Sequence, residues 1–153
     1  MSTRWKNITE ADILAYQPAP MVDALKTAAL AEDQRPPLDD AIQNITAEIR
    51  SVIKTAGLAV DRNETKIPGE LLKHAIALVI AYAKPRINQP LSDDEKENAR
   101  KANEWLLAIA KGQIKVAAPD DPEAAEASTQ TSGGAQLVRP SKTVAKRGDY
   151  SGL

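Results

Sequence analysis

The stretch that decides the fold is PPLDDAIQNITAEIRSVIKTAG, residues 36–57. Its apolar side chains recur at intervals of three and four residues, which places them on one face of a helix. They are Leu38, Ile42, Ile45, Ile49, Val52 and Ala56. Pro36 and Pro37 suit a helix start, because the first amides of a helix need no intrahelical acceptor, and Gly57 supplies a stop. The stretch therefore predicts an amphipathic helix about 30 Å long.

Two shorter helices are expected before this one. Residues 9–12 (TEAD) form a capping box, in which a Thr oxygen accepts a hydrogen bond from an orphan amide and an acid follows three residues later. The helix that it opens, through Leu14, ends before Pro18. Residues 21–30 hold enough apolar side chains for a second short helix.

Two further helices are expected after residues 58–67, a connector that is either a loop or carries a short extended piece around Leu58 and Val60. Pro68 begins the first of them and Pro85 ends it. Its side chains are apolar around most of the circumference, as in a helix buried between neighbours. Residues 92–95 (SDDE) form a second capping box and open the last helix, which ends at Gly112. The expected inner face of this helix carries Ala99, Ala102, Trp105, Leu106, Ile109 and Ala110.

Together these segments predict an all-α fold, a small bundle of four to five helices over residues 1–118. The core must be aliphatic, because the chain has no Phe and only 3% aromatic residues. Trp5 is either a lid on this core or an exposed anchor, and we expect it to pack on its own domain. With Trp105, Leu106 and Ile109 it makes up the candidate core or interface residues.

Residues 119–153 differ in composition and predict a long C-terminal arm that is extended or disordered on its own. The segment is rich in Pro, Ser, Thr, Ala and acidic residues, and it has too few apolar side chains to offset the entropy of ordering. Spaced apolar and basic side chains in it are candidates for capture by a partner groove or sheet edge. They are Leu137, Val138, Arg139, Lys142, Val144, Lys146, Arg147, Tyr150 and Leu153.

No group of residues in the sequence suggests catalysis, a cofactor or a metal. The chain has no Cys and one His, so the usual zinc ligand sets cannot be assembled. His74 falls on the apolar Pro68 helix and is expected to be a packed or half-exposed side chain. Residues 61–72 begin like a calcium loop but have Lys66 and Leu72 where Gly and Glu are needed. The acids at 93–97 could hold Mg²⁺, but at a helix start they are expected to serve capping and the helix dipole. We therefore expect a protein that is not an enzyme.

The charge and the hydropathy of the sequence also restrict the kinds of partner that the protein is expected to bind. The net charge is −1, which gives no polycationic field to attract nucleic acid. The first residues lack the apolar segment of a secretion signal, and no apolar run approaches the roughly 20 residues that span a bilayer. The sequence is expected to be cytosolic and soluble, with no membrane partner.

Several of these segments, taken in order, resemble one protein family. They are ITEADI (8–13), the aliphatic helix at 41–53, IPGELL (67–72), residues 77–86 and ANEWLLAIAKG (102–112). This order resembles the Mu-like head-completion proteins of tailed phages, which belong with the head–tail connector (adaptor) proteins. The Trp-Leu-x-x-Ile-Ala-x-Gly ending of the last helix is the most telling part. The resemblance covers about residues 5–116, and the long arm departs from the family pattern.

The resemblance implies a structural virion protein. Such proteins are helical bundles that form a ring, commonly of twelve copies, beneath the portal protein; the ring completes the DNA-filled head and docks the neck or tail. The implied partners are the portal protein, neighbouring copies of the chain, the next neck or tail-completion protein, and genomic DNA that passes without sequence-specific binding. The implied location is the neck of the virion, with assembly in the host cytoplasm.

An alternative function rests on the basic part of the arm. Residues 139–147 carry four basic side chains, which would allow a cytoplasmic nucleic-acid-binding or regulatory adaptor module. Four charges are few for tight binding to phosphates, and they suit an acidic protein surface equally well. A titration with duplex DNA at increasing salt distinguishes this function from the connector.

Overall fold

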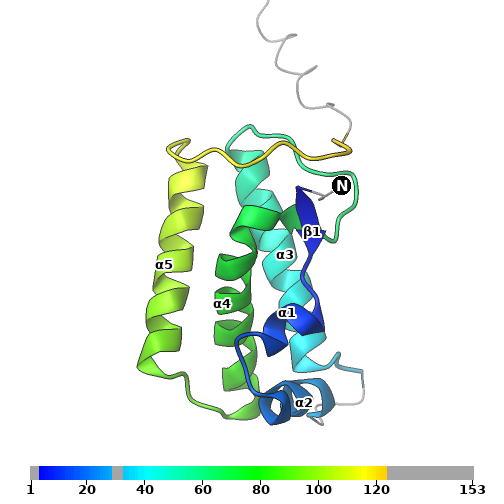
Figure 1. Cartoon of the computed structure of the whole chain (residues 1–153), viewed down its shortest axis with the longest axis vertical. Helices are drawn as coiled ribbons and strands as arrows, with labels where there is room; N and C mark the ends of the chain where they lie inside the picture. The colour runs from blue at the N-terminus through cyan, green and yellow to red at the C-terminus, as the bar shows by residue number, and fades with distance from the viewer. Residues whose placement is uncertain (1–3, 29–32, 124–153) are drawn as a thin grey trace, which may run out of the picture. The chain divides into compact units, whose positions relative to one another are not determined.

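Three long helices lie side by side and make up the body of the domain (Figure 1). They are α3 (Pro37–Thr55), α4 (Leu72–Ala83) and α5 (Asp93–Ala110). The computed structural model describes residues 4–28 and 33–123. α4 lies between α3 and α5 in this view, as expected for the helix with the least polar circumference. The predicted helical bundle is confirmed.

Two short helices precede α3, and their positions partly match the sequence prediction. α1 (Glu10–Leu14) begins at a complete capping box formed by Thr9 and Asp12, as predicted. α2 spans Ala19–Thr27, so it begins two residues earlier than the expected segment 21–30. Pro18 and Pro20 fix its start, because proline is tolerated in a first helical turn. Val22 and Leu25 anchor α2 in the core.

Both ends of α3 and α5 follow the predicted signals. Ser92 and Glu95 form the second capping box, with both reciprocal hydrogen bonds present. Gly57 and Gly112 follow the C-terminal ends of the two helices with φ of 78° and 76°. Glycine enters this left-handed region without a Cβ penalty, so each ends its helix cleanly.

α4 ends at Ala83, close to Pro85 as expected from the sequence, but the chain remains helical for one more short turn. The chain tightens into the 3-10 helix η2 (Lys84–Ile87), and Asn88 ends it with φ of 58°. Proline is acceptable there because it sits in the first turn of η2. A second 3-10 helix, η1 (Gly69–Leu71), leads from Pro68 into α4.

A small antiparallel sheet, which the sequence analysis did not predict, joins the start of the chain to the connector. β1 (Trp5–Asn7) pairs with β2 (Lys66–Pro68), and Trp5 lies opposite Pro68. Strands of three residues are too short to produce a recognisable alternation. The extended piece in the connector therefore lies at 66–68 and not around Leu58 and Val60.

The core is aliphatic and runs along all three long helices. Ile45, Ile49 and Ile53 of α3 belong to the same buried cluster as Ala75 and Val79 of α4. Trp5 is fully buried at the edge of this cluster, so the expectation that it packs on its own domain is confirmed. Leu106 and Ile109 are buried as well.

Residues 111–123, which follow α5, cross one end of the bundle (Figure 1). Ala117 accepts a hydrogen bond from the Trp5 indole, Asp61 pairs with Pro122 in a β-bridge, and the Glu123 amide donates to the Val60 carbonyl. The compact unit thus extends to Glu123, five residues past the boundary expected at 118. The candidate arm residues from Leu137 to Leu153 lie outside the described residues.

Candidate interaction surface

Trp105 is the candidate residue whose position differs most from the sequence prediction. The expected inner face of α5 included it, but 40% of its surface is exposed, whereas Ala102, Leu106 and Ile109 are buried. Ala102, Leu106 and Ile109 are spaced by four and three residues, so these three side chains already fill the face of α5 toward α4. Trp105 precedes Leu106 by one residue, so it points about 100° away, to the flank of the helix.

The Trp105 indole is held in place by a histidine. Its ring stacks on His74 of α4, with ring centroids 4.9 Å apart and planes inclined by 29°. Burial under this contact, and then the neighbouring charge of Lys73, lowers the pKa of His74 below 6.5. The imidazole is therefore neutral at pH 7 and acts here as an aromatic support.

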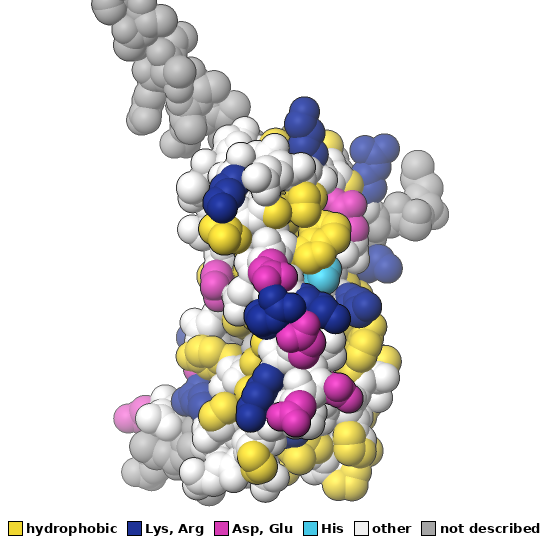
Figure 2. Space-filling model, turned by 90° about the vertical axis from the view of Figure 1, so that its left-hand side faces the viewer, with side chains coloured by type: hydrophobic (Ala, Val, Ile, Leu, Met, Phe, Trp, Pro, Cys, Tyr) yellow, Lys and Arg dark blue, Asp and Glu magenta, His cyan; other side chains and the backbone are white. Residues whose placement is uncertain are grey.

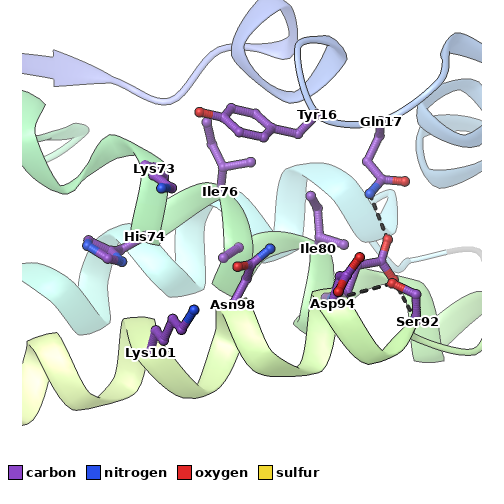
Figure 3. A pocket seen from close by; sticks show the side chains of 12 residues that line it. Tyr16, Gln17, Lys73, His74, Ile76, Ile80, Ser92, Asp94, Asn98 and Lys101 are labelled. Atoms are coloured by element: carbon purple, nitrogen blue, oxygen red, sulfur yellow. Dashed lines mark hydrogen bonds between the residues drawn. The ribbon is translucent and has the colours of Figure 1, made fainter.

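A groove adjoins this pair between α4, α5 and the turn after α1. Its volume is about 350 Å³. Ile76, Ala77 and Ile80 of α4 provide its apolar surface, and Tyr16 covers part of it. Lys73, His74 and Lys101 lie at one end and Ser92 and Asp94 at the other (Figure 3). The groove therefore has a basic end and an acidic end.

A buried ion pair closes the acidic end of the groove. Lys84 Nζ lies 2.9 Å from Glu95 Oε2, and both side chains are largely buried. Gln17 donates a hydrogen bond of 2.7 Å to Glu95 Oε1. Burial alone would raise the pKa of Glu95, but hydrogen bonds from the Ser92 amide, Lys84 and Gln17 together lower it below 4.5. This network ties the turn after α1 to η2 and α5.

Other large apolar side chains are exposed beyond the groove. Leu107 on α5 is 55% exposed, and Tyr82 on α4 is 41% exposed. The Tyr82 hydroxyl accepts a hydrogen bond from Asn44 of α3, so it lies on the side of α4 toward α3. On the face that α5 presents, hydrophobic side chains gather beside the histidine, and basic and acidic side chains are interspersed below them (Figure 2).

A second, more open hollow runs along α3, with a volume of about 710 Å³. Ile42, Thr46 and Arg50 line it, together with Glu64 and Glu123. The Thr46 hydroxyl is buried and has no hydrogen-bond partner within the described part of the chain.

The groups that sequence reasoning missed are those that depend on packing between helices. Lys73 and Lys101 lie far apart in the sequence and line the same end of the groove only because α4 packs on α5. His74 and Trp105 were each noted, but nothing in their spacing predicted a stack. Over residues 4–28 and 33–123, no group of three His, Asp or Glu side chains could hold a metal ion.

Comparisons with protein-family models, with curated proteins and with solved structures found no match for this chain. Within the described ranges, no helix combines the length and the apolar character that crossing a bilayer requires.

Proposed function

We propose that this chain is a structural subunit of the head–tail connector of a tailed phage. In this role, copies of the helical body assemble in a ring beneath the portal, complete the DNA-filled head and dock the neck or tail. The family resemblance of residues 5–116 suggests this role. The proposal also includes virion localisation and the absence of an enzymatic role.

The observation that carries the proposal is the position of Trp105. Within the Trp-Leu-x-x-Ile-Ala-x-Gly segment, Leu106 and Ile109 are buried and Gly112 ends α5, so these residues have a folding role. Trp105 does not fill the core, and its indole stacks on His74 at the surface. Tryptophan is enriched among the residues that dominate the energy of protein interfaces. A preordered, exposed Trp favours an assembly contact over a role in folding alone.

The balance of charge is compatible with a channel component. Residues 119–153 carry 4 basic and 5 acidic side chains, which leaves residues 1–118 with 16 of each. A neutral body does not gain affinity for DNA by releasing counterions from phosphates. Genomic DNA would pass such a ring without being retained.

Binding to the portal ring of the same phage tests the proposal. We expect the full chain to bind the portal, and Trp105→Ala to weaken binding at least about tenfold, as for a residue that dominates an interface. Tyr82→Ala is the matched control, because Tyr82 is an aromatic residue of nearly equal exposure on another side of the body. It should change the affinity less than about threefold.

Two results would contradict the connector. One is absence of portal binding by the full chain at concentrations at which the chain stays folded. The other is tight binding to duplex DNA that weakens steeply with salt, which would favour the nucleic-acid-binding alternative.

A further inference from the structure

α5 carries a second stripe of side chains, separate from its core face. From Asp94 to Trp105 the stripe follows intervals of four, three and four residues, which bring side chains to one face of a helix. Its members are Leu91, Asp94, Asn98, Lys101 and Trp105. The last four lie on α5 and are exposed. Leu91 lies before the helix, next to the cap residue Ser92, and is half-buried against the core. Asp94, Asn98 and Lys101 follow one another along the groove (Figure 3).

The order of side-chain types in this stripe is symmetric about Asn98. An apolar residue stands at each end, an acid and a base lie inward from the ends, and an amide lies at the centre. If a second copy of α5 lies antiparallel across a two-fold axis at Asn98, the acid of each copy faces the base of the other. The apolar ends then meet as Leu91 against Trp105, and the amides of Asn98 meet each other.

We propose that two copies of this chain pair through α5 in this antiparallel arrangement. A two-fold interface requires a surface that is complementary to itself, and this stripe meets that requirement. Asp94 and Lys101 are about 10 Å apart along the helix in both copies. Both intermolecular ion pairs therefore form at the same register. A parallel pairing would place like charges opposite each other, so the charges also set the direction.

The surroundings of the stripe favour an incoming carboxylate at its basic end. Lys73 of α4 lines the same end of the groove as Lys101, so Asp94 of a second copy meets two ammonium groups. Among the described residues, the one ion pair of Lys101 is a contact of 3.9 Å to Glu97. Asp94 makes no ion pair within 4.0 Å among the described residues. Both charges are thus available to a second copy.

Trp105 supplies the apolar end of the contact. Because His74 fixes the indole, docking costs less side-chain entropy than docking of a free Trp. Leu91 of the second copy would cover the exposed part of the ring. Since only the ends of the stripe are apolar, we expect reversible association that depends on protein concentration.

This pairing goes beyond the connector proposal and does not depend on it. Subunits of a ring meet head to tail, through two different surfaces, whereas a two-fold pair uses one surface twice. The α5 pair would then be a form of the free subunit, and portal binding that uses Trp105 would compete with it.

Charge reversal tests the register. Asp94→Lys and Lys101→Glu should each weaken self-association of the full chain at least about tenfold in sedimentation equilibrium, because each sets like charges opposite each other. The double variant Asp94→Lys/Lys101→Glu is again complementary to itself and should return to within about fivefold of the original affinity. Asp93→Lys and Lys96→Glu change charges outside the stripe and serve as controls. Far-ultraviolet circular dichroism checks that each variant is folded.

A single-cysteine experiment tests the axis. The chain has no Cys, so Asn98→Cys introduces one thiol per copy, next to the proposed axis. Under mild oxidation it should form a disulfide-linked dimer at least about ten times faster than Lys96→Cys, which lies on the opposite side of α5.

Equal cross-linking rates for these two cysteines, or a double charge variant that fails to recover, would overturn the pairing. A chain that stays monomeric at several hundred micromolar would do the same. The connector proposal would stand in each case, because portal binding is measured separately with the Trp105 and Tyr82 variants.

Discussion

The indole Nε1 of Trp5 donates a hydrogen bond of 2.9 Å to the backbone carbonyl of Ala117, which lies 112 positions later in the chain. The Ala117 amide in turn donates to Glu70 Oε1 at 2.7 Å. The first strand, the start of the α4 segment and the segment after α5 are therefore joined at one point. Trp5 is therefore held in place by this hydrogen bond as well as by the packing of its ring in the core.

Replacement of Trp5 measures what its hydrogen bond and its ring each contribute to stability. Trp5→Phe keeps an aromatic ring but removes the N–H donor, so we expect a loss of about 1–2 kcal/mol in the free energy of unfolding. Trp5→Ala also leaves a cavity in the core and should cost about 3–5 kcal/mol. Urea denaturation followed by circular dichroism measures both. Trp105→Phe, at the exposed position, is the control and should cost less than about 1 kcal/mol.

The residues around Ala117 show where reasoning from the sequence reached its limit. Asp120, Asp121 and Glu123 were expected to belong to the C-terminal arm (residues 119–153), because acidic residues near prolines are typical of segments that do not fold alone. In the structure, Arg4 donates its amide to Asp120, Arg62 donates its amide to the Asp121 carbonyl, and Glu123 pairs with Lys54. These partners belong to distant parts of the chain, so no local pattern revealed them.

Truncation tests this revised boundary. A chain that ends at Ala118 loses the backbone bonds of Asp121 and Glu123 to the connector, whereas a chain that ends at Glu123 keeps them. We expect the shorter chain to be less stable by about 1 kcal/mol, since the two bonds together contribute about 2 kcal/mol and the entropy of ordering the segment opposes part of this gain. Thermal and urea unfolding of the two truncated chains provide the comparison. Equal stability would mean that residues 119–123 do not contribute to the fold.

Arg50 is a buried cation that binds backbone carbonyls. Only 6% of its surface is exposed. Its guanidinium donates to the carbonyls of Asp61, Asn63 and Lys66 at 2.6–3.1 Å. These hydrogen bonds hold the connector against α3. The central carbon of the guanidinium lies 5.9 Å from the Trp5 ring centroid.

Arg50→Met should lower the free energy of unfolding by about 3 kcal/mol, because three inward-facing carbonyls lose their donor. Arg50→Lys should retain only part of this stability, since an ammonium lacks the planar guanidinium that reaches several carbonyls at once. Lys54→Met is the matched control one turn further along α3. Its ion pair with Glu123 is about half exposed, so it should cost less than about 1 kcal/mol. A result for Arg50→Met as small as that of the control would contradict the assigned role.

The helices were predictable because their signals are local. The capping residues Thr9 and Ser92 and the stop residues Gly57 and Gly112 act within one helical turn, and the structure confirms each of them. The groove was not predictable in the same way. It depends on which flank of α5 faces solvent, and that is decided by packing against α4. Once Ala102, Leu106 and Ile109 face α4, Trp105 is directed to the flank of the helix, and the sequence alone does not say which of these side chains face α4.

The stack of His74 on Trp105 makes the histidine a reporter of the groove. Burial, and secondly the charge of Lys73, lowers its pKa below 6.5. Nuclear magnetic resonance titration of the single imidazole should therefore give a midpoint below 6.5. Trp105→Ala exposes the ring to water, and Lys73→Ala removes the nearby charge, so both should move the midpoint back toward 6.5. Lys111→Ala, which changes a lysine outside the groove, should leave it in place.

The same shift predicts how stability depends on pH. In the unfolded chain His74 takes up its proton near pH 6.5, but in the folded chain it does so only at lower pH. The contribution of neutral His74 to the free energy of unfolding is therefore complete above pH 6.5, and it is lost as the pH falls through the folded-state pKa of this histidine. The free energy of unfolding of the original chain should fall over that range, and His74→Gln should remove that part of the slope. If the imidazole titrates at or above 6.5 in the folded chain, the ring is solvated, and the indole does not cover it.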